Sequence, residues 1–234
     1  VATAFVPDGM SDGNGGIFRE DDYDYPDADS HGYYSAEYDF DAAKAEATEL
    51  LESIGYKFND DGTLSDENPI SVEYLINENT GHQAIAEAIQ SDWSSIGVDV
   101  TIKTEEWDTF VNDRKAGAFS IAREGWIADY DDPINMLEIF TSDSGNNDAQ
   151  LGKNPENAAT PDWTEYDNLI SEIRATTDTA ARADMLHQAE DMLMDTWAAV
   201  PIYYYNDDYM CKTNITGIYD TKFNTKYFMY ANIE

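Results

Sequence analysis

Charged and aromatic side chains are concentrated in the eleven residues from Arg123 to Pro133, REGWIADYDDP, which include one arginine, one tryptophan and four acidic residues. Arg123 can neutralise its neighbour Glu124 or another nearby acid. Asp131 and Asp132 precede Pro133, which suits the first position of a helix, and negative charge is favourable at a helix N-terminus. These residue types predict ion pairs between side chains and a helix whose N-terminus is capped by a carboxylate.

No motif of a common enzyme class accompanies this segment. The sequence has no P-loop, no GxGxxG motif after a strand, no HExxH pair and no nucleophile elbow between a strand and a helix. Acidic pairs are frequent, but in a chain with 48 acidic residues such a pair says little about glycosidase chemistry. We therefore expect that the protein is not an enzyme.

The composition limits the kinds of partner. The net charge of −35, from 13 basic and 48 acidic residues, repels phosphate backbones and anionic lipid surfaces. We therefore expect no nucleic-acid partner, and we interpret most carboxylates as a solvated surface. The hydrophobic content of 42%, with 16 tyrosines and 9 phenylalanines, is sufficient for a folded core.

Metal and disulfide frameworks are not expected. One cysteine and three histidines exclude an intrachain disulfide framework and a Cys/His metal cluster. The acidic runs EDDYDYPDAD and NDDGTLSDEN lack the ligand spacing of a calcium loop, so we interpret both as solvated loops. We expect neither a metal nor a cofactor. No run of 18 or more apolar residues is present.

The hydrophobic pattern predicts alternating helices and strands after an irregular start. Residues 1–38 have no sustained period and predict a long irregular surface segment. Helices are expected over 41–54, 85–96, 105–111, 133–140, 166–173 and 186–197, with Asp41 and Thr104 as N-caps. Strands are expected over 71–76, 98–103, 119–123 and from Val200, VPIYYY. The alternation predicts an α/β protein around one mixed sheet, flanked by helices.

The order of these elements and several strings resemble the C-terminal lobe of the extracellular solute-binding proteins that supply peptide ABC importers, the oligopeptide-binding family. From about Tyr38 to the C-terminus, the strings are ELLESIGY, SIGVDV after Trp93, EEWDTFVNDRKAGAFSIAREGWIADYDDP, SDSGNNDA, YDNLI and VPIYYY. FVPDGM at Phe5 resembles the segment by which such chains lead into this lobe. The resemblance implies a periplasmic-binding-protein-like fold, in which residues 1–38 lead into a single ligand-binding lobe over 39–234.

The resemblance also assigns roles to individual residues, because in this family the peptide lies between two lobes. Asp129 falls where peptide-binding members place the carboxylate that pairs with the α-ammonium group of the ligand. Arg123 falls where an arginine can meet the carboxylate end of a short peptide. Arg114 and His82 match positions that in some members contact the ligand carboxylate, and Trp107 matches a tryptophan of the cleft.

Trp126 completes the set of expected ligand-binding residues. A structural alternative stays open for several members of the set. Trp126 and Trp107 can be packing residues, and His82 at a helix start can be a surface or capping residue. A zwitterionic peptide in a closed cleft needs both termini compensated, because an unpaired buried charge is costly.

The resemblance implies a receptor outside the cytoplasmic membrane, either a cell-surface lipoprotein or a periplasmic protein, that captures short peptides and delivers them to the permease of an ABC transporter. Family members carry a further N-terminal lobe, so we expect the chain to be one lobe excised from a two-lobed parent. Two alternatives remain. The same fold can bind another solute, such as a nickel chelate, haem, a sugar or a signalling peptide, or the chain can be an acidic surface protein that makes protein contacts.

Overall fold

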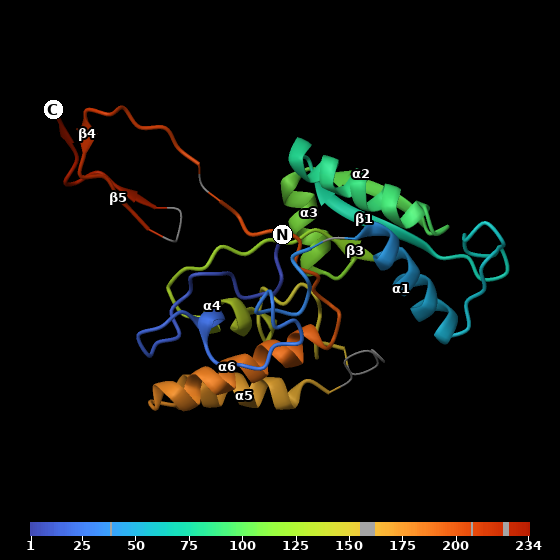
Figure 1. The fold of residues 1–234 in the computed structure, drawn as a ribbon, viewed down its shortest axis with the longest axis horizontal. Coiled ribbons are helices and arrows are strands. Elements are labelled where there is room, and N and C mark those ends of the chain that lie inside the picture. The colour runs from blue at the N-terminus through green and yellow to red at the C-terminus, as the bar shows by residue number, and fades with distance from the viewer. Residues whose placement is uncertain (38, 155–161, 207, 222–224) are drawn as a thin grey trace. The chain divides into compact units, whose positions relative to one another are not determined.

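The computed structural model describes residues 1–234 with the exception of 38, 155–161, 207 and 222–224. The chain divides into two compact units (Figure 1): a terminal unit, Val1–Ala36 with Trp126–Glu234, and a central unit, Glu37–Gly125. The expected division was different, with residues 1–38 leading into one lobe over 39–234. The observed boundary after Ala36 lies close to the expected one, but the N-terminal segment packs with the C-terminal half of the chain. That residues 39–234 make up one lobe stays a prediction.

The central unit contains a three-stranded sheet in the order β2-β1-β3. Its strands are β1 (Ser71–Asn77), β2 (Asp99–Glu105) and β3 (Ile121–Ala122). Both neighbours run parallel to β1, so this sheet is parallel throughout and not mixed. β3 is shorter than the expected 119–123, because only Tyr74 and Leu75 of β1 pair with it. The α/β class is confirmed.

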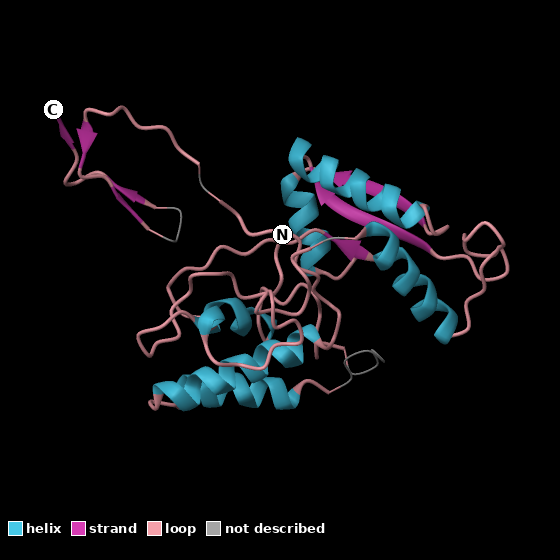
Figure 2. Ribbon diagram, viewed as in Figure 1, coloured by secondary structure: helices cyan, strands magenta, loops and turns pink. Residues whose placement is uncertain are grey.

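Three helices flank these strands (Figure 2): α1 (Phe40–Ser53), α2 (Thr80–Ser94) and α3 (Trp107–Lys115). Two of the expected N-caps are wrong by two residues. Asp39, and not Asp41, accepts a hydrogen bond from the backbone of α1. Glu106, and not Thr104, caps α3, because β2 continues through residue 104 and α3 begins only at residue 107.

The side chains of β1 are divided between two faces of the sheet, since successive side chains of a strand point to opposite faces. Tyr74 and Ile76 are buried in a cluster with residues of β2 and α2, and Ala47 and Leu51 of α1 pack against it. Leu75 and Asn77 therefore lie on the other face, where Leu75 is fully buried. Asn77 is the last residue of β1, and it brings a polar side chain to the end of this face.

The terminal unit is built from helices and irregular chain. Its helical elements are η1 (Phe18–Glu20), α4 (Ile134–Leu137), η2 (Glu138–Phe140), α5 (Thr164–Ala175) and α6 (Thr179–Met194). Their apolar side chains form one cluster that includes Tyr166, Ile170 and Leu186. Apart from η1, residues 1–36 are irregular, as expected, but Val6 and Phe18 are fully buried in that cluster. The expectation of a surface segment is therefore wrong, because this segment supplies part of the core.

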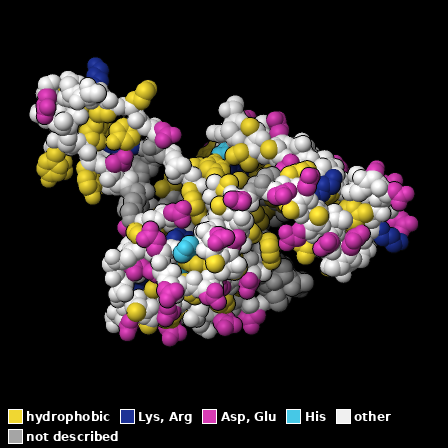
Figure 3. All heavy atoms as spheres, in the orientation of Figure 1, with side chains coloured by type: hydrophobic (Ala, Val, Ile, Leu, Met, Phe, Trp, Pro, Cys, Tyr) yellow, Lys and Arg dark blue, Asp and Glu magenta, His cyan; other side chains and the backbone are white. Residues whose placement is uncertain are grey.

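The C-terminal part of the chain departs from the sequence expectation. Residues 200–205, VPIYYY, form no strand. The chain then forms two short antiparallel ladders: β4 (Ile215–Thr216) with β7 (Asn232–Ile233), and β5 (Tyr219–Asp220) with β6 (Lys226–Tyr227). Several apolar side chains in and around these ladders are exposed: Tyr209, Met210, Tyr219, Phe228, Met229, Tyr230 and Ile233. Figure 3 shows hydrophobic side chains, in yellow, on the surface of this part of the chain.

No helix among the described residues is long and apolar enough to cross a membrane. Tyr38, where the family resemblance begins, and residues 155–161 of the polar segment before α5 lie outside the described residues.

Candidate functional site

The carboxyl ends of the three parallel strands bring polar and aromatic side chains to one edge of the central unit. β1 ends at Asn77, β2 ends at Glu105, and Arg123 directly follows β3, where its backbone N–H donates to the carbonyl of Leu75. In open α/β sheets, ligands bind beyond the carboxyl ends of the strands. This edge is therefore the part of the central unit best suited to hold a ligand.

Arg123 is held on two sides at this edge. Its Nε donates a hydrogen bond of 2.9 Å to Oδ1 of Asn77, which is 8% exposed. Its guanidinium carbon lies 5.8 Å from the ring centroid of Trp107 and 5.5 Å from that of Phe110. A guanidinium over an aromatic face is attracted by the ring quadrupole. Arg123 is thus fixed in orientation without being neutralised by these contacts.

Arg114 approaches Phe110 as well, with its guanidinium carbon 5.0 Å from the centroid of this fully buried ring. Its Nε lies 2.7 Å from a carboxylate oxygen of Glu124. The sequence suggested that Arg123 neutralises its neighbour Glu124, but the carboxylate of Glu124 pairs with Arg114. Arg114 is 9% exposed, so it is a buried partner for Glu124, the residue that follows Arg123.

His82 lies in the first turn of α2, close enough to Arg123 for the two groups to interact. Burial, and then the positive charge of Arg123, lower the pKa of His82 below its usual value. Asn79, not His82, caps this helix, because its Oδ1 accepts from the backbone N–H groups of Gly81 and His82. His82 is therefore neutral at pH 7 and can donate or accept a hydrogen bond.

Asp129 and Trp126 belong to the terminal unit. The backbone N–H of Asp129 and Nε1 of Trp126 both donate to Oδ1 of Asn135, at 2.9 and 3.1 Å. Asn135 is 3% exposed, whereas Asp129 is exposed. The buried amide fixes the backbone of residues 126–129 and leaves the carboxylate of Asp129 facing solvent. Trp126 also packs against the core, so its structural role is established.

The two following aspartates have separate partners. Asp132 Oδ1 accepts from the backbone N–H of Ile134, the first residue of α4, so its carboxylate lies at this helix start. Pro133, expected at the first helical position, occupies the N-cap position instead. Asp132 also pairs with Arg182, at 2.9 Å. Asp131 Oδ1 accepts from the backbone N–H of Ser11, 120 positions away, so this carboxylate holds the N-terminal segment. Its expected capping role stays a prediction.

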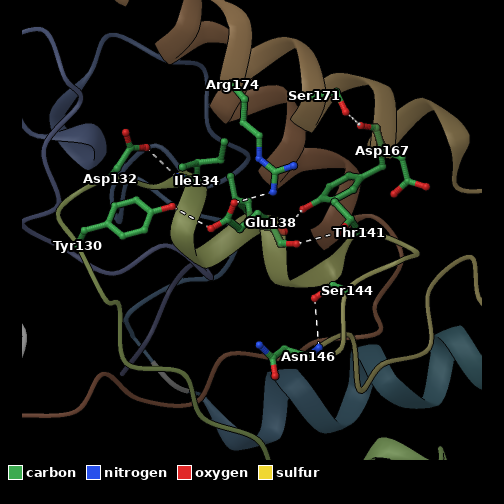
Figure 4. A network of polar contacts seen from close by, with 12 residues as sticks. Tyr130, Asp132, Ile134, Glu138, Thr141, Ser144, Asn146, Asp167, Ser171 and Arg174 are labelled. Carbon is green, nitrogen blue, oxygen red and sulfur yellow. Dashed lines mark hydrogen bonds and ion pairs between the residues drawn. The ribbon is translucent and has the colours of Figure 1, made fainter.

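A second polar network ties this segment to α5 (Figure 4). The hydroxyl of Tyr130 donates to Oε1 of Glu138 at 2.8 Å, and Oε2 of Glu138 lies 2.7 Å from Nη2 of Arg174. Burial, and then the hydrogen bond to Glu138, raise the pKa of Tyr130. Hydrogen bonds from Trp126 to Asn135 and from Tyr130 to Glu138 therefore hold the loop on both sides of Asp129.

Sequence reasoning missed Asn77, Phe110 and Asn135 as members of these sites. Asn77 carried a usable signal, since a polar residue that ends a buried strand lies at the edge where α/β proteins bind ligands. Phe110 falls within the helix expected over 105–111, and nothing in the sequence distinguishes it from a core residue of that helix. Nothing in the sequence connects Asn135 with the backbone of Asp129, because the contact depends on the turn of residues 129–133.

The described residues contain neither a cluster of metal ligands nor a nucleophile elbow of the kind that serine hydrolases use. No group of three or more His, Cys, Asp or Glu side chains in that part of the chain is arranged to hold a metal ion. Gly9, Ser11 and Gly13 have the spacing of a nucleophile elbow, but that motif requires a strand-to-helix turn. Ser11 lies in irregular chain, with an isolated bridge to Ile17.

The fold is that of a solute-binding protein. Residues 9–148 match the family of bacterial extracellular solute-binding proteins, family 5, in its middle region. The chain belongs to this family, which confirms the resemblance. This is a family of solute-binding proteins and not of enzymes.

Two relatives and one solved structure illustrate the similarity. The chain is 32% identical over 173 residues to the oligopeptide-binding protein OppA of Bacillus subtilis (strain 168), covering 74% of this chain and 30% of that protein. It is 35% identical over 139 residues to the dipeptide-binding protein DppE of the same strain, covering 58% of this chain and 24% of that protein. The structure of Haemophilus influenzae OppA in complex with RPPGFSPFR superposes with a TM-score of 0.64 and 29% identity, covering 86% of this chain and 36% of that one. The chain thus spans about 30% of the length of the curated OppA proteins it matches.

Proposed function

We propose that this chain is part of a longer, two-lobed receptor that captures short peptides outside the cytoplasmic membrane and delivers them to the permease of an ABC transporter. The receptor is a binding protein and not an enzyme. It is either a lipid-anchored protein of the cell surface or a periplasmic protein. The lobe that is absent here supplies the opposite wall of the peptide site.

The observation that carries this proposal is that Arg123 is oriented by its neighbours but is not neutralised by them. Its Nε and its aromatic neighbours hold it in place, yet no acidic side chain of the described residues pairs with it. A half-buried, oriented and unneutralised cation suits the carboxylate end of a ligand, because charge-assisted bonds to carboxylate are among the strong hydrogen bonds. The exposed carboxylate of Asp129 suits the opposite end, an α-ammonium group.

The positions named from the family resemblance share these roles in the proposal. Arg123, His82, Arg114 and Trp107 form the carboxylate side, with Arg114 acting through Phe110 and Glu124. Asp129 and Trp126 form the ammonium side. Recognition of both peptide termini and little of the side chains permits broad specificity, with side-chain pockets that hold water.

Isothermal titration of the full-length receptor with mixed tripeptides to pentapeptides tests this function. Saturable binding that requires a free amino terminus and a free carboxyl terminus is expected. The 234-residue chain alone is expected to bind these peptides no tighter than ~1 mM, because half of the buried contacts are missing. Binding of a nickel chelate, haem or a sugar by a full-length receptor that ignores peptides would contradict the peptide assignment.

A further inference from the structure

The side chain of Asn77 determines which edge of Arg123 remains available. A guanidinium offers two edges to a carboxylate: the pair Nε and Nη2, or the pair Nη1 and Nη2. Asn77 Oδ1 occupies Nε at 2.9 Å. The amide oxygen must face the arginine, since a guanidinium has donors only. The Nε edge is therefore closed to a ligand.

The other edge of Arg123 is open. Among the described residues, neither Nη1 nor Nη2 of Arg123 takes part in a hydrogen bond or ion pair, and neither is a buried atom without a partner. The guanidinium also lies near the rings of Trp107 and Phe110, whose faces do not use its N–H groups. The Nη1–Nη2 edge is therefore available to a ligand.

The chemical identity of residue 77 matters for the charge of the site. An aspartate here would pair with Arg123, neutralise it and compete with a ligand carboxylate. An asparagine orients the same Nε–H and leaves the full positive charge on the guanidinium. His82 adds no second charge near pH 7, because burial and Arg123 lower its pKa.

We propose that Asn77 is a positioning residue that closes the Nε edge of Arg123 and presents the Nη1–Nη2 edge to the terminal carboxylate of the ligand. This inference rests on the proposed function, because it requires a ligand with a carboxylate at this strand end. It extends that function by naming the geometry of carboxylate recognition and a residue that controls it without touching the ligand.

The test compares peptides with a free C-terminal carboxylate and the same peptides as C-terminal amides in the full-length receptor. Wild type is expected to prefer the free acid. Asn77→Ala is expected to reduce that preference by about tenfold, a change equal to 1.4 kcal/mol. Asn77→Asp, which keeps the shape of the side chain, is expected to abolish the preference because its carboxylate neutralises Arg123. In Arg123→Ala, adding Asn77→Ala is expected to change nothing further.

Asn79→Ala is the matched control, because Asn79 lies two residues away and caps α2 without contacting Arg123. It is expected to lower the melting temperature while keeping the acid preference. In the 234-residue chain, the Nε–H of Arg123 is expected to exchange slowly with solvent by NMR, and faster in Asn77→Ala.

The outcomes separate the two proposals. A wild-type receptor that binds no peptide would overturn both. A receptor that binds peptides and keeps its full acid preference in Asn77→Ala and Asn77→Asp would overturn only the role of Asn77. Equal binding of acid and amide by wild type would also overturn that role, while peptide capture would stand.

Discussion

The guanidinium of Arg19 forms an ion pair with the carboxylate of Glu190, 171 positions further along the chain, where the two side chains are 4% and 0% exposed. Both groups also bind the backbone of Val6. Arg19 Nε donates to the carbonyl of Val6 at 2.9 Å, and the backbone N–H of Val6 donates to Glu190 at 2.7 Å. The pair therefore fastens the N-terminal segment to α6 in the core of the terminal unit.

Breaking this pair is expected to destabilise the terminal unit strongly. Arg19→Met or Glu190→Gln leaves one buried charge without its partner, which costs ~3–5 kcal/mol. The double substitution Arg19→Met with Glu190→Met is expected to cost much less than the sum of single changes, since no charge is left behind. Urea unfolding followed by the fluorescence of Trp126 and Trp163 measures these values. Single variants that lose less than ~1 kcal/mol would show that the pair does not hold the segment.

Replacing each of the two aspartates before α4 by alanine is expected to lower the free energy of unfolding by a different amount. Asp132→Ala removes a hydrogen bond to the first backbone N–H of α4 and the partner of Arg182, so it is expected to cost ~2 kcal/mol or more. Asp131→Ala removes a hydrogen bond to the backbone of Ser11 at the surface, and is expected to cost ~1 kcal/mol or less. Urea unfolding of both variants provides the comparison. Equal losses would contradict the separate roles of the two side chains.

His187 is expected to make the terminal unit sensitive to mild acid. Its ring is stacked between Phe18 and Tyr23 at 3.9 and 4.2 Å, and its nitrogens lie 3.2 Å from Tyr25 Oη and Asp21 Oδ2. Burial, and then the charge of Arg19, lower the pKa of His187 from 6.5 to about 4. In the neutral tautomer with its proton on Nε2, this nitrogen donates to Asp21, and Nδ1 is left as an acceptor beside the Tyr25 hydroxyl.

The sign of this pH dependence follows from proton binding. Between pH 6.5 and about 4 the unfolded chain holds a proton on His187 that the folded chain does not, so stability is full above pH 6.5 and falls as the pH decreases to about 4. The shift corresponds to ~3 kcal/mol. The raised pKa of Asp21, caused by burial and then by Asp12 and Asp184, acts in the opposite direction.

His187→Gln is expected to remove the part of the pH dependence that is due to His187. His31→Asn, at an exposed position, is expected to leave that part unchanged. Unfolding free energies measured from pH 7.5 to 4.5 decide this, and identical profiles for wild type and His187→Gln would contradict it.

Salt is expected to stabilise the protein. Acidic side chains, in magenta, are scattered over the visible surface in Figure 3, and the net charge of −35 makes the folded state repel itself. Raising NaCl from 10 to 150 mM shortens the Debye length from ~30 to ~8 Å and screens that repulsion. The melting temperature is therefore expected to rise over this range. Sucrose at matched osmolarity is the control, and a melting temperature that falls with NaCl would contradict the repulsion argument.

Asp129 is expected to hold the ammonium end of the peptide in the full-length receptor. Truncating one member of a desolvated charge pair costs ~2–5 kcal/mol, so Asp129→Ala is expected to weaken peptide binding at least tenfold. N-acetylation of the peptide is expected to weaken wild-type binding similarly, and the two changes together are expected to cost less than their sum. Asp131→Ala is the matched control and is expected to leave affinity nearly intact. Equal binding of acetylated and free peptides by wild type would remove Asp129 from the site.

The sequence alone determined the α/β class, the family and most helices, because these depend on local periods and on strings of neighbouring residues. The period of β1 and the glycine after α1 are readable without knowledge of the fold. The resemblance likewise singled out Arg123 and Asp129, whose surroundings in sequence are distinctive.

The tertiary structure alone decided which partners those residues have. Glu124 pairs with Arg114 and not with its neighbour Arg123, Asn77 reaches Arg123 across 46 positions, and Asp131 reaches Ser11 across 120. It also decided that the irregular residues 1–36 supply buried core, with Phe18 completely enclosed. Such contacts depend on how distant segments are brought together, and hydrophobic periodicity describes only which face of one element is buried, not what that face meets.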